Sequence, residues 1–229
     1  MAYVFKQDFV STAKHSIKCP YKMTPQFITV HNTANDAPAE NEIAYMKRNN
    51  NAVSYHVAVD DKNVIQAIPF NRNAWHAGDG GNGAGNRKSI GIEICYSKSG
   101  GERYRQAEEN AVQYIAKLLH EFGWGVDRVK QHYDWSRKNC PHRIRAEGRW
   151  QSFIQRVNDA LQALKNPKAK EEAEEIVLNE TGRKEAREII KRAVKEGVFT
   201  SKHENVDKYD DGTLVSYVIA YVNRVGIRR

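Results

Sequence analysis

SIGIEIC, residues 89–95, repeats isoleucine at every second position. Because successive side chains of a β-strand point to opposite faces, this alternation predicts a strand with one strongly apolar face. The apolar face carries Ile90, Ile92 and Ile94, and the opposite face carries Gly91, Glu93 and Cys95. Glu93 is therefore expected to face away from the isoleucine-lined core.

Two further segments have the composition of strands. QFITVHNT (26–33) and SYHVAVDDKNVIQAI (54–68) are rich in β-branched and aromatic residues, which favour extended structure. The DDKN sequence inside the second segment predicts a turn, so this segment is expected to form a hairpin.

Apolar residues recur with helical spacing elsewhere in the chain. A helix is expected over 36–48, with Asp36 as its cap and Pro38 in its first turn. The same periodicity predicts helices over 108–122, ended by Gly123, and over 150–164. The predicted fold class is α/β (α+β), with a mixed central β-sheet flanked by helices.

The sequence KNPKAKEEAEE, residues 165–175, combines a proline with a run of charge and has almost no apolar content. Such a composition favours a linker. Helical spacing over 182–196 and 214–222 predicts that the chain beyond it is mainly helical. The expected organisation is a large domain at 1–164, a linker at 165–174 and a small module at 175–229.

The 229-residue chain carries a formal charge of +8. The excess lies mainly in 1–164, which has 22 basic and 16 acidic residues, against 14 and 12 in the remainder. A basic chain favours polyanionic partners, such as nucleic acid, an acidic membrane or an anionic cell wall. No zinc finger, helix-turn-helix or aromatic-basic signature supports nucleic acid, and no apolar run is long enough for membrane insertion.

The N-terminal sequence MAYVFKQDFVSTAKH is charged within its first eight residues and lacks the apolar core of a secretory signal. Synthesis in the cytoplasm is therefore expected. The three cysteines, Cys19, Cys95 and Cys140, are odd in number and widely spaced. This argues against a disulfide framework and favours reduced thiols or a metal ligand.

The stretch QHYDWSRKNCPHR, residues 131–143, brings His132 and Cys140 within eight residues of each other. Imidazole and thiolate are zinc ligands, and a catalytic zinc site takes three protein ligands with a fourth position open to water. The best third candidate is His31, which ends the predicted strand QFITV, because strand ends hold side chains rigidly near solvent. No HExxH, paired CxxC or PCxxC motif is present.

Five segments in this order resemble the zinc-dependent N-acetylmuramoyl-L-alanine amidases. This family includes phage endolysins, bacterial autolysins and peptidoglycan recognition proteins. The resemblance is greatest to endolysins of phages that infect Gram-positive bacilli. The segments are TVHNTA (29–34), SYHVAVDD (54–61), WHAGDG (75–80), SIGIEI (89–94) and HYDWSRKNCP (132–141).

The resemblance implies one Zn²⁺ ion held by His31, His132 and Cys140. It implies catalytic roles for three further residues, namely Glu93 as proton acceptor for the attacking water, Lys138 as oxyanion stabiliser, and Tyr55. Substrate contacts are implied for Asn32 and His76. Neither Cys95 nor His142 is expected to act as a ligand.

The Gly-rich segment GDGGNGAGNRKS, residues 78–89, suggests a phosphate-binding loop at first sight. Arg87 stands where that motif requires glycine, however, and a strand follows instead of a helix, which excludes the motif. A flexible loop beside the substrate groove is expected instead, because glycine permits turns that other residues resist.

The implied reaction is hydrolysis of the amide bond between N-acetylmuramic acid and L-alanine of the peptidoglycan stem peptide. By analogy with modular endolysins, the module at 175–229 is expected to bind an anionic cell-wall polymer. The alternative is a helical appendage that only stabilises or dimerises the protein. An endolysin would be made in the host cytoplasm and reach the wall through a pore formed by a separate protein.

Two alternatives of the same fold remain open. One is a cytosolic amidase that recycles muropeptides, although the appended module and basic large domain favour intact wall as substrate. The other is a recognition protein that binds peptidoglycan without cutting it. Loss of the cysteine ligand leads to that state, and Cys140 is present.

Overall fold

A computed structural model describes residues 3–166, 178–199, 203 and 205–226 of the chain. It contains two compact units, Met1–Leu164 and Lys165–Arg229. Each unit has its own hydrophobic core among the described residues.

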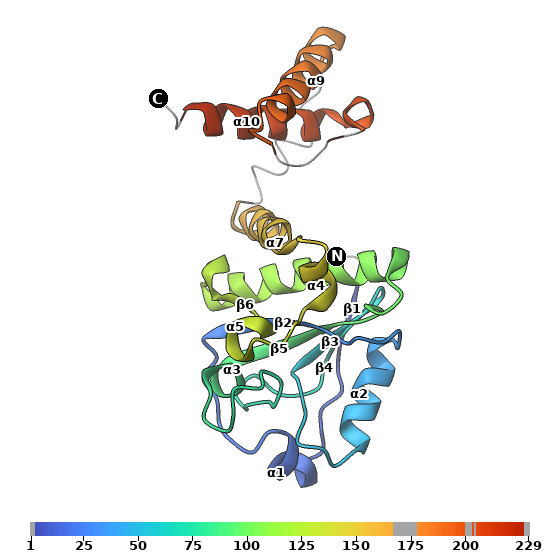
Figure 1. The fold of residues 1–229 in the computed structure, drawn as a ribbon, viewed down its shortest axis with the longest axis vertical. Helices are drawn as coiled ribbons and strands as arrows, with labels where there is room; N and C mark the ends of the chain where they lie inside the picture. Colours follow the sequence, from blue (N-terminus) through green and yellow to red (C-terminus); the bar gives the residue numbers. More distant parts are fainter. Residues whose placement is uncertain (1–2, 167–177, 200–202, 204, 227–229) are drawn as a thin grey trace. The chain divides into compact units, whose positions relative to one another are not determined.

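The first unit is built on a six-stranded sheet with the order β1-β4-β3-β5-β2-β6 (Figure 1). Only β3 and β4 pair antiparallel, and the other neighbours pair parallel. The sheet is therefore mixed, as the sequence predicts. Its strands are β1 (Val4–Gln7), β2 (Phe27–Asn32), β3 (Val57–Val59), β4 (Asn63–Gln66), β5 (Ser89–Ile94) and β6 (Val129–Gln131).

The strand β5 lies between β3 and β2, near the middle of the sheet. Its isoleucines Ile90, Ile92 and Ile94 are all fully buried, as their alternation predicts. The expected hairpin is the antiparallel pair β3 and β4, joined across the DDKN turn. The two outer strands, β1 and β6, were not anticipated from the sequence.

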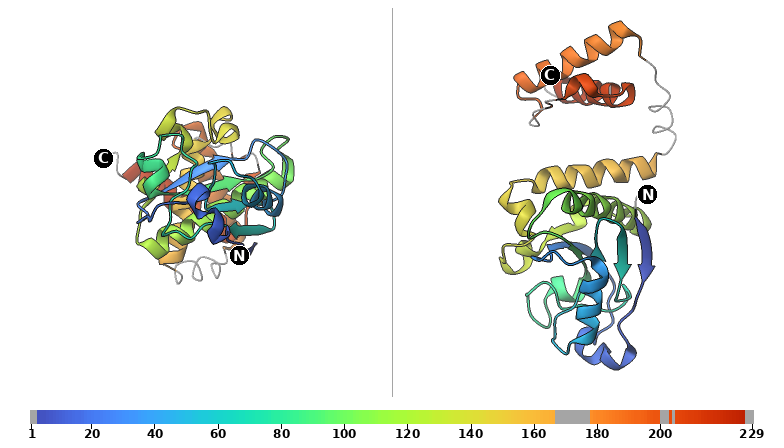
Figure 2. Two further views of the ribbon diagram at one scale, coloured as in Figure 1. Left: turned by 90° about the horizontal axis from the view of Figure 1, so that it is seen from below. Right: turned by 90° about the vertical axis from the view of Figure 1, so that its right-hand side faces the viewer.

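Helix α4 (Gly101–Phe122) lies along one face of the sheet, and α7 (Trp150–Lys165) stacks outside it (Figures 1 and 2). α4 begins seven residues before the predicted start, and Tyr104 and Ala107 of this added part are buried. Gly123 ends the helix in a left-handed conformation, with φ of 66°. Its N–H donates to the carbonyl groups of His120 and Leu119, which fits a glycine C-cap.

Helix α2 (Ala39–Arg48) begins three residues later than predicted, because Pro38 is the N-cap residue. The prediction that Asp36 caps this helix is wrong. The Asp36 carboxylate accepts a hydrogen bond from Ser99 N instead. The first helical N–H, that of Ala39, donates to the Asp60 carboxylate at 2.9 Å, so a residue beside the hairpin turn satisfies this helix end.

Short helical segments connect these elements. These segments are η1 (Thr12–Lys14), α1 (His15–Lys18), α3 (Ala84–Lys88), η2 (Val126–Arg128), α5 (His132–Ser136) and α6 (His142–Ala146).

The second unit is helical, as predicted. It contains α9 (Glu180–Lys195), η3 (Val206–Lys208) and α10 (Asp211–Gly226). Its core includes Ile190, Phe199 and Leu214. Of the predicted linker at 165–174, only residues 165 and 166 belong to the described part of the chain. Among the described helices, none is both long and apolar enough to cross a membrane.

Candidate metal centre

The pairing of β2 with β5 places His31 directly beside Glu93. Neighbouring residues in register on adjacent strands point to the same face of a sheet. The two side chains therefore stand together on the face opposite the isoleucines of β5. Both strands are near their C-terminal ends at this point, where loops and short helices can close over the side chains.

The strand β6 delivers His132 to the same place. β6 pairs with β2 up to Gln131 opposite Val30, and His132 follows as the first residue of α5. Gln131 and Asp134 form a capping box at the start of this helix, with Asp134 accepting from Gln131 N at 2.8 Å. The sharp change from strand to helix thus fixes the position of His132 next to His31.

Cys140 returns to the site through the loop after α5. Arg137 ends that helix in the left-handed conformation, and Tyr133 N donates to the Cys140 carbonyl at 3.0 Å. At the far side of the loop, Arg143 N donates to the Asn32 side chain at 3.0 Å. These contacts hold the loop against the end of β2 and turn the Cys140 sulfur toward His31.

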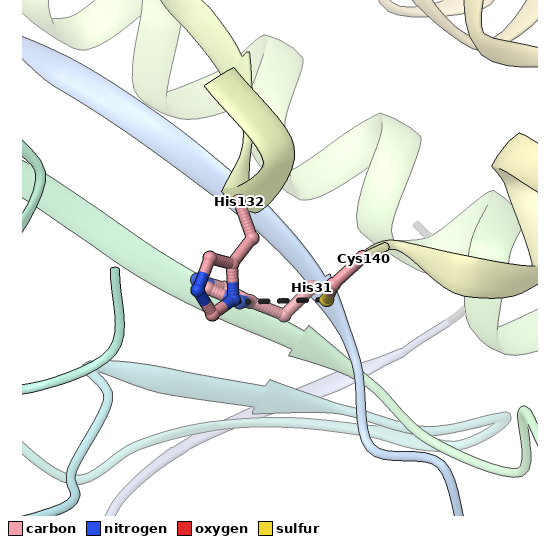
Figure 3. A group of neighbouring side chains, drawn as sticks. All are labelled: His31, His132 and Cys140. Carbon is pink, nitrogen blue, oxygen red and sulfur yellow. Dashed lines mark hydrogen bonds between the residues drawn. The ribbon is translucent and has the colours of Figure 1, made fainter. Parts of the chain in front are cut away.

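His31, His132 and Cys140 converge on one point (Figure 3). Their ligand atoms all lie within 4.8 Å of one another, and all three residues are buried. His31 Nδ1 lies 3.0 Å from His132 Nδ1 and 3.7 Å from Cys140 Sγ. Tetrahedral zinc with bonds of about 2.0–2.3 Å keeps its ligands about 3.3–3.8 Å apart. The separation of 3.7 Å lies within this range and that of 3.0 Å is slightly shorter, so the donors are close enough together to share a single ion.

The electrostatic state of the three residues also suits a metal. Burial, with the charges of His76 and His132, holds the pKa of His31 well below its usual value. Burial lowers the pKa of His132 to about 4, and Lys138 acts in the same direction. Both imidazoles are therefore neutral and have a lone pair to offer. Burial raises the pKa of the Cys140 thiol to about 12, which a bound cation would reverse.

Glu93 is the acidic group beside the three candidate ligands. Its Oε2 atom is buried and has no hydrogen-bond partner. Burial, and secondly the charge of Glu42, raise the pKa of Glu93 to about 8, while Lys138 opposes this shift. A carboxyl group poised near neutral pH is suited to general acid-base chemistry.

The hydroxyl of Tyr55 is also buried without a hydrogen-bond partner. Burial, and then the charge of Glu93, raise the pKa of Tyr55, so the phenol is protonated near neutral pH. Lys138 is exposed, yet its charge acts on His31, His132 and Glu93. The structure therefore gathers Glu93, Lys138 and Tyr55 around the predicted ligands, although their catalytic roles stay predictions.

The two predicted substrate contacts are buried. The Asn32 side chain accepts a hydrogen bond from Arg143 N, and its amide nitrogen lies 3.4 Å from the Tyr104 hydroxyl. His76 uses one ring nitrogen for His31 and the other for the Ser89 carbonyl. Contact of either residue with substrate therefore stays a prediction.

Cys95 and His142, which are not expected to be ligands, do not belong to the three-donor cluster. The His142 ring lies 3.3 Å from the Ser97 carbonyl, and Cys95 is a buried free thiol. Sequence reasoning missed Trp135, whose indole N–H donates to Thr29 Oγ1 at 2.9 Å and so ties α5 to β2. Its position three residues after His132, which places both on one side of a helix, is the signal that could have identified it.

Comparison with known proteins gives a family for this arrangement. Residues 21–143 match the family model of N-acetylmuramoyl-L-alanine amidases (Amidase_2). The amidase CwlA of Bacillus subtilis (strain 168) is 62% identical over 150 residues, which are 66% of this chain and 55% of CwlA. The amidase XlyB of the same organism is 61% identical over 66% of this chain and 47% of its own length. The chain thus spans about half the length of these relatives.

Solved structures agree with the sequence comparison. PlyL is 57% identical and aligns with a TM-score of 0.66, covering 68% of this chain and 97% of PlyL. The PlyG catalytic domain is 56% identical, with a TM-score of 0.66, over 69% of this chain and 95% of that domain. The match in sequence extends over the strands and loops that carry the candidate metal centre. The chain belongs to the N-acetylmuramoyl-L-alanine amidase family.

Proposed function

We propose that the chain is a zinc-dependent peptidoglycan hydrolase that cleaves the amide bond between N-acetylmuramic acid and L-alanine of the stem peptide. The observation that carries the proposal is the convergence of His31, His132 and Cys140 beside the unpartnered carboxyl oxygen of Glu93. The names of the relatives support the same bond specificity.

Zn²⁺ held by the two imidazoles and the thiolate would supply a water molecule of lowered pKa, near 7, and would polarise the substrate carbonyl. Glu93 accepts a proton from the attacking water at its carboxylate and passes it to the leaving amine nitrogen. Such acid-base catalysis contributes about 10²- to 10⁴-fold. Burial suits Glu93 to this task, because it raises the pKa of the carboxyl group in the metal-free chain and so favours receipt of a proton.

Lys138 and Tyr55 complete the polar surroundings of the reacting bond. The Lys138 ammonium group is exposed, and a positive charge near the substrate carbonyl stabilises the oxyanion that develops there. The protonated Tyr55 hydroxyl has a hydrogen bond to donate and no protein acceptor. We propose that this hydroxyl donates a hydrogen bond either to the same developing negative charge or to the bound stem peptide.

Mass spectrometry of digested cell walls tests the bond that is cut. The expected products are stem peptides with a free L-alanine amino group, without new reducing sugar ends. New reducing ends, or release of peptides cut elsewhere, would contradict the proposal. Soluble muropeptides, tested in parallel with intact walls, would identify a recycling enzyme if only the small substrates were cleaved.

We also propose that the second unit binds an anionic cell-wall polymer and thereby keeps the enzyme near its substrate. An independent hydrophobic core supports its function as a separate module, and attachment raises the effective concentration of the enzyme at the wall. Sedimentation of residues 165–229 with purified walls tests this. A module that stays in the supernatant while the full chain sediments would rule out the binding role.

The site of action follows from the substrate in this proposal. The chain would be made in the cytoplasm of the host and would reach the wall through a pore formed by a separate protein. Fractionation of producing cells, with and without such a pore protein, tests this. Wall lysis without the pore protein would contradict it.

A further inference from the structure

His76 lies next to the candidate ligand His31 and contacts it edge-on. The two ring centroids are 5.0 Å apart and the ring planes are nearly perpendicular, at 88°. His76 Nδ1 lies 3.0 Å from His31 Nε2. The remaining nitrogen of His76, Nε2, lies 3.1 Å from the backbone carbonyl of Ser89. Three groups therefore form one continuous chain of hydrogen bonds that ends at the metal centre.

The donor and acceptor roles in these hydrogen bonds follow from the Ser89 carbonyl. The Ser89 carbonyl can only accept, so His76 Nε2 must carry the hydrogen. His31 Nδ1 is the nitrogen that faces His132 and Cys140, so a His31 ring that binds a metal there carries its hydrogen on Nε2. His31 Nε2 then donates to His76 Nδ1, which accepts with the lone pair of a ring whose hydrogen is on Nε2.

The fold provides a specific place for the His76 ring. A Cβ atom at Gly91 would lie only 2.8 Å from His76 Cγ and Cδ2, so glycine at this position of β5 makes room for the ring. On the other side, Asn86 Oδ1 accepts from the backbone N–H groups of His76 and Ala77, each at 2.8 Å. Both the ring and its backbone are thus held from separate elements.

We propose that His76 is a positioning residue that fixes His31 in the tautomer and orientation needed to bind the metal through Nδ1. This inference depends on the proposed zinc site. Hydrogen-bonded partners of ligand histidines fix ring orientation, and their loss typically lowers metal affinity about 10- to 100-fold. The Ser89 carbonyl extends the chain and sets the tautomer of His76 in turn.

Zinc titration of the metal-free protein tests the proposal without relying on activity. His76→Phe keeps a ring in the space above Gly91 but removes the acceptor, so zinc affinity should fall about 10- to 100-fold. His76→Asn should recover much of this loss, because its amide oxygen can take the position of Nδ1. An affinity for His76→Phe equal to that of the wild type would overturn the proposal.

His56 offers a matched control. It is fully buried and its ring lies 5.9 Å from that of His76. Its own hydrogen bonds go to Gly91 N and the Arg72 carbonyl, and not to a candidate ligand. His56→Phe should therefore leave zinc affinity within about twofold of wild type. Equal weakening by His56→Phe and His76→Phe would show a general packing effect and would also overturn the proposal.

A second measurement needs no variant. Nitrogen-15 NMR of the metal-free wild-type chain should find the proton of His31 on Nε2 and that of His76 also on Nε2. A proton on His31 Nδ1 would overturn the inference even if the His76 variants failed to fold. Failure of the wild type itself to bind zinc would instead contradict the proposed function.

Discussion

At the scale of single residues, each candidate ligand is positioned by the backbone on which it stands. His31 is set by strand register, His132 by a capped helix start, and Cys140 by a loop pinned at both ends. None of the three depends on a flexible side chain reaching from a distance. Substitutions at these positions should therefore change the chemistry of the site more than its shape.

Replacement of Cys140 by serine should remove bound zinc and abolish wall lysis, because a neutral hydroxyl replaces a thiolate ligand. Metal analysis of the purified variant measures the effect. Cys95→Ser is the matched control, since Cys95 is equally buried but lies outside the three-donor cluster. Full zinc occupancy in Cys140→Ser would contradict the assignment.

Glu93→Gln should retain zinc but lose at least about 10²-fold in turnover, because the acid-base group is removed. A pH-dependent stability change should accompany the loss. The carboxyl group ionises near 4.5 when unfolded and near 8 when folded and metal-free. The unfolded chain therefore binds fewer protons between these values, and the wild type loses stability as pH rises.

Urea unfolding in the presence of a chelator checks this sign. Glu93→Gln has no such titration, so its stability advantage over the wild type should grow from pH 4.5 to pH 8 and be smallest below pH 4.5. A constant difference between the two proteins across this range would show that Glu93 is not held in a protonated state by its surroundings.

The residues that could be predicted from sequence are those whose chemistry is visible in their identity. Histidine and cysteine are common metal ligands, and the alternation of isoleucines in 89–95 indicates the face of the sheet on which Glu93 lies. The contact between His76 and His31 was not predictable, because it joins residues 45 positions apart through ring nitrogens whose direction depends on tertiary packing. The role of Gly91 in making room for a ring is hidden for the same reason.

At the scale of elements, α4 and α7 are joined by a buried carboxylate. Glu108 is almost fully buried and accepts hydrogen bonds from Arg149 and Arg156, at 2.6 and 2.7 Å. Burial would raise the pKa of Glu108, but the two guanidinium groups hold it below its usual value. These ionic contacts attach the outer helix α7, and the segment that precedes it, to α4.

Glu108→Gln should destabilise the first unit by about 1.5–3 kcal/mol, the range for lost hydrogen bonds to charged groups. Because the folded-state pKa of Glu108 is depressed, its contribution is present above pH 4.5 and is lost as pH falls through the folded pKa. The wild type and the variant should therefore converge in stability at low pH in urea unfolding experiments.

Glu109→Gln supplies the matched comparison. Glu109 is the next residue along α4 and pairs with Arg156 at 2.6 Å, but its side chain is 44% exposed. Exposed ion pairs contribute about 0–1 kcal/mol, so this change should be nearly neutral. Equal costs for the two variants would mean that burial of Glu108 is not what gives the contact its strength.

Elements with a visible sequence pattern were predictable, whereas elements without one were not. β5 carries alternation, the amphipathic helices carry helical spacing, and the hairpin carries a turn sequence between two apolar runs. β6 has only three residues and gains its identity from pairing with β2. The start of α2 was misplaced because its first N–H is satisfied by Asp60, from the hairpin, and not by a residue just before it.

At the scale of the whole molecule, the chain has two units with separate cores, and the proposed functions assign hydrolysis to the first unit and attachment to the second. A chain of residues 1–166 should retain zinc and cleave soluble muropeptides at nearly the rate of the full chain. It should act more slowly on intact walls, because the gain in effective concentration is lost. Rates on the two substrates measure this, and an equal loss on both would mean that the second unit supports the fold of the first.

The candidate metal centre can form during folding only after β2 and β5 have paired in the observed register. A shift of one residue in this register would place Glu93 on the opposite face of the sheet. His31 must also be joined by His132, which lies 101 positions further along the chain. A metal-sensitive dye present during refolding would therefore report when the three candidate ligands come together. Its signal should appear only when the most distant parts of the sheet have joined, at the same moment as the last protected backbone amides of β2.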